Sequence, residues 1–197
     1  MNIDEKEVLK QIQQGDSDAF TYIVETYQTP VHNLCYRMLG NGQEAEDAAQ
    51  ETFWRAYQSI NRYDPNRSFI TWLLSIAAHY CIDQQRKKKL LTFDIDLLPE
   101  GNVPDLTPQP EKIFSQKEEG KKVQALLSSL KPIDRTAIVL KYWYDFSEKE
   151  ISQTLDISVS AVKSRLFRAR QLLSKQWQFP KTEEVKAGGV FHESPTI

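Results

Sequence analysis

The sequence predicts an all-α protein built from two small helical domains that are joined by a flexible acidic linker. Apolar residues recur every three or four positions over most of the 197 residues, which is the period of an amphipathic helix. That period is lost in residues 92–117, which carry Pro99, Pro104, Pro108, Pro110 and five acidic residues. We therefore expect this organisation: a first domain over 1–91, a linker over 92–117, a second domain over 118–177 and a disordered tail over 178–197.

Three helices account for most of the first domain. The first passes through Phe20 and ends at Leu39, because Gly40-Asn41-Gly42 follows and glycine commonly ends a helix. The second spans about Gln43 to Ile60, with an alanine-rich apolar face and an acidic opposite face. A turn-rich loop over Asn61–Ser68 leads to the third, which runs from about Phe69 to Lys88 and ends in a basic run.

The second domain ends in a helix-turn-helix pattern. Helices are expected from about Phe114 and again from Pro132, a residue suited to a first helical turn, to about Tyr144. Ser147 and Glu150 then form a capping box at the start of a short helix. After a turn, Ser158 caps a last helix that runs to about Lys175.

Charge is unevenly distributed along the chain. The net charge is only −2, yet no acidic residue occurs between Ile157 and Lys181, where six bases are found. A cationic helix behind a short helix and a tight turn fits the major groove of DNA, and its basic, hydroxyl and aromatic side chains contact phosphates and base edges. A solvated basic face on a helical hairpin is the alternative. The expected DNA readers on this helix are Lys163, Ser164, Arg165, Phe167, Arg168 and Arg170.

Several functional classes are not expected. Two cysteines exclude a disulfide scaffold and fit a reducing cytosol, and the spacing of Cys35, His79 and Cys81 matches no zinc site. No nucleophile–base set, catalytic carboxylate pair or glycine-rich phosphate loop is present, so we predict a protein that is not an enzyme and uses no cofactor, metal or small-molecule substrate. The apolar stretch Phe69–Ile82 is too short and polar to span a bilayer, and the polar start does not resemble a signal peptide, so a cytoplasmic, nucleoid-associated protein is expected.

Two long motifs resemble bacterial sigma factors. Residues 47–57 (DAAQETFWRAY) and 69–77 (FITWLLSIA), with Asp83 and Arg86, look like region 2. Residues 130–170, ending in VKSRLFRAR, look like region 4, and no region 1.1 or region 3 fits between the two. This two-domain form resembles the extracytoplasmic-function sigma factors, which direct RNA polymerase to promoters.

The resemblance implies that one face of the second helix docks on the coiled coil of the polymerase β′ subunit. An acidic, amide-bearing face suits a basic partner. A solvated face stabilised by pairs such as Glu51–Arg55 is the alternative. The resemblance also implies that the β flap of polymerase is a partner of the chain. The expected β′-binding residues are Asp47, Gln50, Glu51 and Phe53.

The resemblance places −10 recognition and melting on the loop and on the third helix. Aromatic and polar groups hold unstacked bases, and cations hold phosphates. Tyr63 matches the position that holds a flipped base, and its alternative is a loop aromatic that covers the core. His79 faces the same pocket by analogy, and its alternative is a satisfied buried histidine. The expected −10 residues are Asn61, Arg62, Tyr63, Arg67, His79, Arg86 and Lys87.

The expected function is therefore promoter-specific initiation with core polymerase, with the last helix on the −35 element and an anti-sigma factor as regulator. On this basis Arg165→Ala relaxes −35 recognition by about 1–3 kcal/mol. The acidic linker either occupies a basic channel of polymerase or serves as a solvated spacer. Two other functions compete: a polymerase-independent DNA-binding regulator that uses residues 118–177 alone, and a decoy that sequesters an anti-sigma factor.

Overall fold

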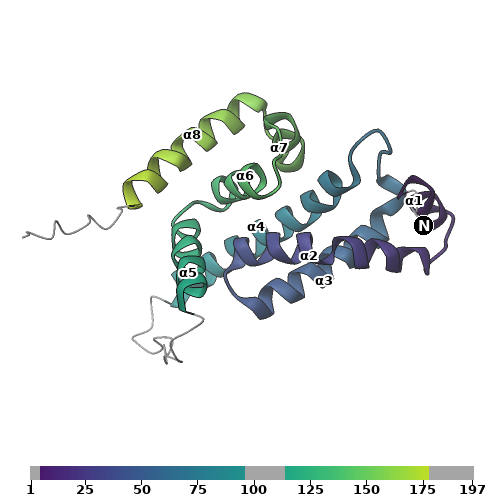
Figure 1. The fold of residues 1–197 in the computed structure, drawn as a ribbon, viewed down its shortest axis with the longest axis horizontal. Coiled ribbons are helices and arrows are strands. Elements are labelled where there is room, and N and C mark those ends of the chain that lie inside the picture. Colours follow the sequence, from purple (N-terminus) through teal and green to yellow (C-terminus); the bar gives the residue numbers. More distant parts are fainter. Residues whose placement is uncertain (1–4, 96–113, 178–197) are drawn as a thin grey trace, which may run out of the picture.

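A computed structural model describes residues 5–95 and 114–177 of the chain, and these residues form helices connected by short turns (Figure 1). No strand is found in the described ranges, which confirms the all-α prediction. None of the described helices is both long and apolar enough to cross a membrane. The helices are α1 (Glu5–Gln13), α2 (Ala19–Leu39), α3 (Gly42–Ser59), α4 (Phe69–Ile95), α5 (Phe114–Ser128), α6 (Pro132–Trp143), α7 (Glu148–Leu155) and α8 (Val159–Gln176), with a 3₁₀ turn at Ile60–Arg62.

The turn between α2 and α3 forms as the sequence predicts. Gly40 adopts a left-handed conformation with φ 78°, which a residue with a Cβ takes only with strain, and its N–H donates to the Tyr36 carbonyl at 2.8 Å. The Asn41 side chain then accepts a hydrogen bond from the Glu44 N–H at 3.1 Å. Both ends of the turn are therefore closed by local hydrogen bonds.

The helix that begins at Phe69 extends further than expected. We predicted its end at about Lys88, whereas α4 continues to Ile95. No glycine or proline occurs between Lys88 and Ile95, and the first proline after the helix is Pro99, so nothing in the chain forces an earlier end. Residues 92–95 and 114–117 of the expected linker are thus helical, while 96–113 and the tail 178–197 lie outside the described residues.

Local sequence signals set the ends of the helix-turn-helix. Ser147 and Glu150 form the predicted capping box at the start of α7. The turn after α7 is made at Asp156, which has φ 52°, and the Ser158 hydroxyl accepts from the Ala161 N–H at 3.2 Å at the start of α8. The predicted caps are therefore confirmed, and they fix where α8 begins.

Replacing Ser147 by alanine is expected to lower the free energy of unfolding by about 1 kcal/mol. The Ser147 hydroxyl and N–H donate to the Glu150 carboxylate at 2.7 and 2.8 Å, and these hydrogen bonds lower the pKa of Glu150. Because the folded pKa is depressed, this contribution is present above the unfolded pKa and is lost as the pH falls through the folded value. Urea unfolding at pH 7 and at pH 3 measures the effect, with Ser174→Ala as control. A difference from wild type that persists unchanged in acid contradicts the assignment.

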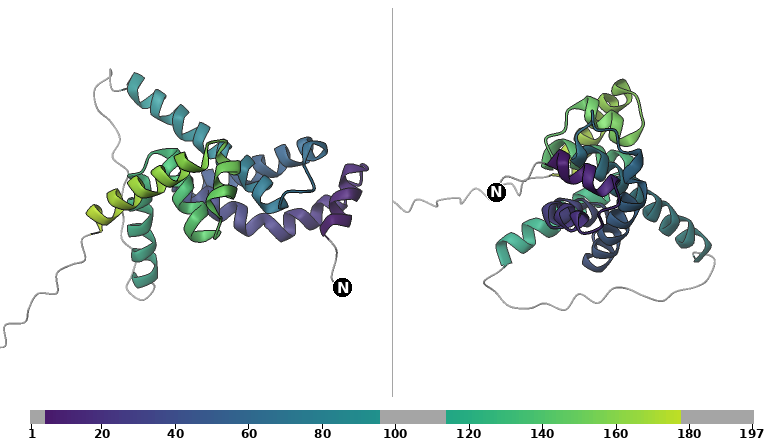
Figure 2. Two further views of the ribbon diagram at one scale, coloured as in Figure 1. Left: turned by 90° about the horizontal axis from the view of Figure 1, so that it is seen from above. Right: turned by 90° about the vertical axis from the view of Figure 1, so that its right-hand side faces the viewer.

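The two halves of the chain pack against each other. In both views of Figure 2 the second half, green to yellow, lies against the first half, purple to teal. Helices α6 and α7 pack on α4, and α5 and α6 pack on α2. Buried apolar residues of both halves, such as Leu34 and Leu74 with Val139 and Ile151, belong to one continuous cluster. The linker is thus not the sole connection between the halves.

Candidate nucleic-acid and protein interfaces

The exposed face of α8 carries most of the predicted DNA readers. Val162, Leu166 and Ala169 are buried against α6 and α7, so the residues between them point outward. Phe167 is 54% exposed, which is unusual for a phenylalanine that serves only packing. The exposed readers are Lys163, Ser164, Phe167, Arg168 and Arg170.

Arg165 differs from its neighbours on α8. Its guanidinium donates to the Asp134 carboxylate of α6 at 2.8 Å, with the two side chains 27% and 14% exposed. Its Nε is buried without a hydrogen-bond partner within the described residues. The structure therefore gives Arg165 a bridging role between α8 and α6, and a contact with a base requires this pair to break. DNA readout by Arg165 stays a prediction.

Arg165→Ala is expected to lower the free energy of unfolding by about 1–3 kcal/mol, because Asp134 is left partly buried without its cation. The matched control is Arg168→Ala on the exposed face of α8, for which we expect a change within about 0.5 kcal/mol. Urea unfolding measures both variants. Unchanged stability of Arg165→Ala together with relaxed −35 selectivity contradicts the bridging role and assigns Arg165 to DNA.

Tyr63 lies in the loop between α3 and α4, and its ring is buried with 8% exposure. The ring packs against Phe69 and Trp72 at centroid distances of 5.3 and 5.4 Å, and its hydroxyl donates to the Arg67 carbonyl at 2.6 Å. Burial raises the pKa of Tyr63. This geometry favours the alternative that Tyr63 covers the core, so its contact with a flipped base stays a prediction.

The remaining loop residues present polar and basic groups to solvent. Asn61, Arg62 and Arg67 are exposed, and the Arg67 guanidinium lies 3.8 Å from the Asp64 carboxylate. Hydrogen bonds from Asn66 lower the pKa of Asp64 and hold the turn. The loop therefore keeps a fixed shape with two outward cations at its edges.

His79 is exposed on α4, so the alternative of a buried histidine is wrong. Its Nδ1 lies 2.7 Å from the Ser75 carbonyl oxygen, which only accepts, so Nδ1 carries a proton in this hydrogen bond. Trp72, His79 and Arg86 follow at a spacing of seven residues and share one face of the helix. This stripe extends over about 20 Å, a length that suits several nucleotides better than one.

Two cations end this stripe. Arg86 and Lys87 are exposed, and the Arg86 guanidinium lies 3.5 Å from Asp83 in an exposed pair that competes weakly with a phosphate. The structure thus brings Arg86 and His79 onto one face of α4, with Lys87 beside them.

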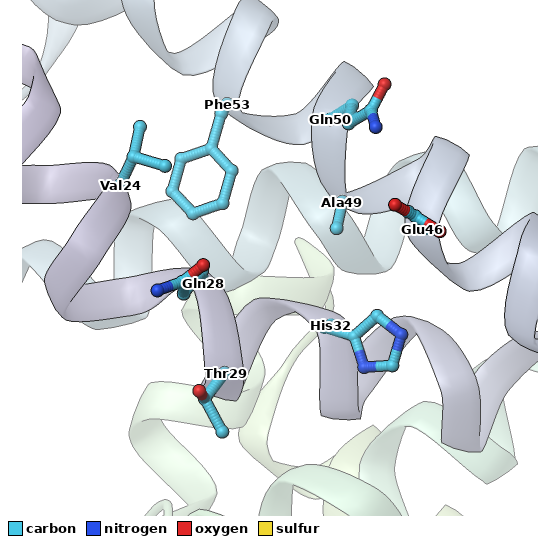
Figure 3. A pocket seen from close by; sticks show the side chains of 8 residues that line it. All are labelled: Val24, Gln28, Thr29, His32, Glu46, Ala49, Gln50 and Phe53. Atoms are coloured by element: carbon cyan, nitrogen blue, oxygen red, sulfur yellow. The ribbon is translucent and has the colours of Figure 1, made fainter.

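A hollow of about 450 Å³ lies between α2 and α3. Figure 3 shows side chains of the two helices facing each other across it, with Phe53 and Val24 at one end and His32 and Glu46 towards the other. Gln50 and Phe53, two of the expected protein-binding residues, line this hollow, although the Phe53 ring is largely buried. Its complete lining is Val24, Gln28, Thr29, His32, Glu46, Ala49, Gln50 and Phe53.

Trp54 is not among the protein-binding residues expected from the sequence, yet its position suits that role. Trp54 is 57% exposed and lines a second hollow that shares Val24, Gln50 and Phe53 with the first. It follows Gln50 by four positions and Asp47 by seven, so helical spacing alone places it on the same face as two predicted residues. An exposed tryptophan beside a hollow is a common anchor in protein interfaces.

The acidic residues beside the hollow are accessible to a partner. Asp47 is exposed and accepts a hydrogen bond from the Gln43 side chain at 3.3 Å. Glu51 pairs with Arg55 at 2.7 Å, so the intrahelical pair that the sequence offered as an alternative is present. Because this pair is exposed, it contributes little and leaves Glu51 available.

An apolar groove of about 380 Å³ lies in the second half between α5, α6 and α8. Trp143 and Trp177 stand at its rim and are both partly exposed. The groove offers an aliphatic floor and aromatic walls, which suits the apolar face of a helix. Its lining is Val123, Leu126, Leu127, Ile138, Trp143, Leu173, Ser174 and Trp177.

Cys35 and Cys81 are both free and buried. A hydrogen bond with Cys35 and burial raise the pKa of Cys81, so this thiol stays protonated. Within residues 5–95 and 114–177, no group of three or more histidine, cysteine or acidic side chains is arranged to hold a metal ion. The two thiols serve as core residues between α2 and α4.

Both halves of the chain are similar in sequence to known proteins. The sequence model of Sigma-70 region 2 matches residues 23–90, and that of Sigma-70 region 4 matches residues 120–173. The ECF RNA polymerase sigma factor SigW of Bacillus subtilis is 41% identical over 184 residues, which cover 87% of this chain and 95% of SigW.

Two solved structures share the fold. CnrH in complex with the cytosolic domain of CnrY aligns with a TM-score of 0.64 at 23% identity, over 87% of this chain and 96% of that one. The sigma factor RpoE in complex with the anti-sigma factor NepR from Bartonella quintana aligns with a TM-score of 0.61 at 21% identity, over 79% and 94%. At these identities the likeness concerns the arrangement of helices.

Proposed function

The chain belongs to the extracytoplasmic-function RNA polymerase sigma factors, and we propose that the surfaces described above are the ones with which it guides core polymerase to promoters. The observation that carries the assignment is the presence of two different exposed surfaces in one chain. One is the basic and aromatic face of α8, and the other is the hollow between α2 and α3 with Trp54 beside it. A DNA reader and a protein anchor together are what a promoter-specificity subunit requires.

The proposed division of labour follows the two halves. The first half, residues 5–95, binds core polymerase and the −10 element, and the second half, residues 114–177, binds the −35 element. On α8, Lys163, Ser164, Phe167 and Arg168 read the major groove of the −35 duplex, and Arg170 binds phosphate. On α4, the stripe of Trp72, His79 and Arg86 follows the single strand of the −10 element, with Lys87, Arg62, Arg67 and Asn61 beside it.

Polymerase contacts are proposed on both halves. The basic coiled coil of β′ docks over the α2–α3 hollow, where Asp47 and Glu51 supply negative charge and Trp54 supplies an exposed aromatic anchor that docking covers. The apolar groove between α5 and α8 accepts the β flap. These assignments use two hollows of the described structure and leave the proposed DNA-reading side chains uncovered.

Regulation and location follow from the family. One solved relative of the same fold is described with an anti-sigma factor, and we propose that an anti-sigma factor also controls this chain. The chain acts in the cytoplasm, where polymerase is. Polymerase supplies the chemistry, and the chain itself contributes binding and orientation without catalysis.

The packed arrangement of the two halves has to open on a promoter. The −35 and −10 elements lie about 25 base pairs apart by their positions, or about 85 Å along DNA. A compact chain of this length has a radius of gyration of about 16 Å, so it does not reach both elements while its halves are packed. We propose that binding to core polymerase separates the halves.

The two competing functions fit less well. A regulator that acts without polymerase has no use for the α2–α3 hollow and an exposed Trp54. A decoy that only sequesters an anti-sigma factor has no use for exposed Lys163, Phe167 and Arg168 on a precisely capped helix. Both surfaces find a use only in a sigma factor.

Sequential binding tests this function. The labelled chain is titrated with core polymerase and then with promoter duplexes in which the −35 or the −10 element is scrambled, and fluorescence anisotropy reports binding. We expect the chain to bind core without DNA, and the assembled complex to bind the intact promoter at least tenfold more tightly than either scrambled form. Tight binding of the free chain to the −35 duplex, with no binding to core, contradicts the proposal.

A further inference from the structure

One part of the interface between the two halves lies at the C-terminal end of α2. The last carbonyls of a helix have no partner within the helix, and here side chains from three other helices supply donors. Gln124 of α5 lies 3.3 Å from both the Tyr36 and Arg37 carbonyls. Gln85 of α4 and Arg135 of α6 both donate to the Met38 carbonyl. The second half thus closes on the first partly through hydrogen bonds to one helix end.

Burying the Arg135 guanidinium at this interface costs free energy, because a charged group loses its hydration there. It is 7% exposed, the only hydrogen bond of its guanidinium among the described residues goes to the Met38 carbonyl, and its Nε is buried without a partner. None of the ion pairs found among residues 5–95 and 114–177 includes Arg135. Burial lowers the pKa of Arg135 with no opposing charge to raise it, which means that its charged form is disfavoured there.

Arg165, in the same half, differs from Arg135 because it has a carboxylate partner. Its guanidinium is also partly buried, but it lies 2.8 Å from the Asp134 carboxylate. A buried cation with a carboxylate partner regains much of its lost hydration, whereas one that faces a single carbonyl does not. Asp134, which directly precedes Arg135 in the chain, therefore stabilises Arg165, while Arg135 has no carboxylate partner among the described residues.

We infer that Arg135 is a conformational spring: its buried, unpaired guanidinium weakens the packing of the second half on α2 and biases the chain towards opening. This inference rests on the proposed function, in which the halves separate when the chain binds core polymerase. On separation the guanidinium regains water on all sides, and Met38 retains the donor from Gln85, which lies in the first half. Opening thus relieves the cost of burying the Arg135 guanidinium without a carboxylate partner.

Other contacts hold the halves closed against this spring. The Tyr144 hydroxyl donates to the Pro30 carbonyl at 2.5 Å, and the Arg37 guanidinium lies 4.9 Å from the centroid of the Trp143 ring. Burial raises the pKa of Tyr144, so this donor keeps its proton at neutral pH. The interface combines these contacts and its apolar cluster with the buried guanidinium of Arg135, and a partner can open a closed state of this kind.

Single-molecule energy transfer tests the spring on the full chain. Dyes are attached at Glu25→Cys of α2 and Lys175→Cys of α8, both exposed sites, while the buried thiols of Cys35 and Cys81 react slowly. The open fraction of the free chain is measured first, and the concentration of core polymerase that gives half-maximal opening is measured next. Three variants are compared with wild type: Arg135→Met, Gln124→Ala, and Lys149→Met, which removes an exposed lysine of the same half.

The sign of the change distinguishes a spring from an ordinary contact. We expect Arg135→Met to lower the open fraction at least fivefold and to raise the half-opening concentration of polymerase by the same factor. Gln124→Ala, which loses only neutral hydrogen bonds, raises the open fraction, and Lys149→Met leaves it unchanged. An Arg135→Met chain that opens more readily, opens equally or loses helical content overturns the inference. If neither the wild-type chain nor any variant opens on addition of core polymerase, the proposed function is wrong. The role of Arg135 is then still decided by whether Arg135→Met lowers the open fraction of the free chain.

Discussion

An Asp47→Arg chain is expected to bind core polymerase about 100-fold more weakly than the wild-type chain, a loss of about 2.7 kcal/mol. Asp47 is exposed on α3, on the face that it shares with Gln50 and Trp54. If that face meets a basic coiled coil, the substitution replaces an attraction by a repulsion at the centre of the interface. Competition for core polymerase against the labelled wild-type chain measures the loss.

The control for this prediction is Glu119→Arg, which makes the same charge change at an exposed position of α5 in the other half. It keeps the net charge equal to that of the Asp47 variant and leaves α3 untouched. We expect its affinity for core to stay within about twofold of wild type. Equal losses in both variants indicate a general effect of charge and contradict docking through α3.

An Arg168→Ala chain is expected to lose about 1–3 kcal/mol of −35 binding and to stop discriminating at one position of that element. Arg168 is exposed on α8 and pairs with no carboxylate among the described residues, so its guanidinium is available to base edges. Transcription from a set of promoters with each −35 base exchanged in turn measures both effects. Selectivity is the informative readout, because a phosphate contact changes affinity uniformly across the set.

Lys10→Ala is the matched control, because it also removes one exposed cation but from α1 in the first half, far along the chain from α8. It is expected to transcribe every promoter of the set as the wild-type chain does. An Arg168→Ala chain that loses activity by one common factor on all promoters contradicts base reading and assigns Arg168 to the phosphate backbone.

Features fixed by neighbouring residues were predictable from the sequence. The Gly40 and Asn41 turn, the Ser147–Glu150 capping box and the Ser158 cap all depend on side chains within four positions of the groups they satisfy. The exposed face of α8 also followed from helical spacing alone. The end of α4 did not, since the chain lacks a glycine or proline there and a helix without a stop signal has no predictable end.

Features fixed by contacts between distant residues were not predictable. Arg165 pairs with Asp134, 31 positions away, and Arg135 bonds to Met38, 97 positions away. Helical spacing places Arg165 near the face of α8 that is expected to read DNA, but only the packing of α6 beside α8 shows that a carboxylate holds it. The packing of the two halves against each other could not be predicted either, because the sequence shows only an acidic linker between two amphipathic regions.

Trp54 was predictable in its position on the helix but not in its exposure. Its spacing from Asp47 and Gln50 was readable, yet an aromatic residue at helical spacing is more often a core residue than an exposed one. Its exposure follows from the position of α2, which covers Phe53 and leaves the next side chain outside. The hollow beside it is lined by residues of both α2 and α3, so it depends on how the two helices pack, which no local pattern encodes.

Run-off transcription from a randomised promoter library tests whether this one chain gives core polymerase both elements of a promoter. Purified core polymerase is incubated with the library in the presence and absence of the chain, and the transcripts are sequenced. We expect transcripts that require the chain and that share both a −35 and a −10 motif. No chain-dependent transcripts, or transcripts that share a −35 motif alone, would contradict it.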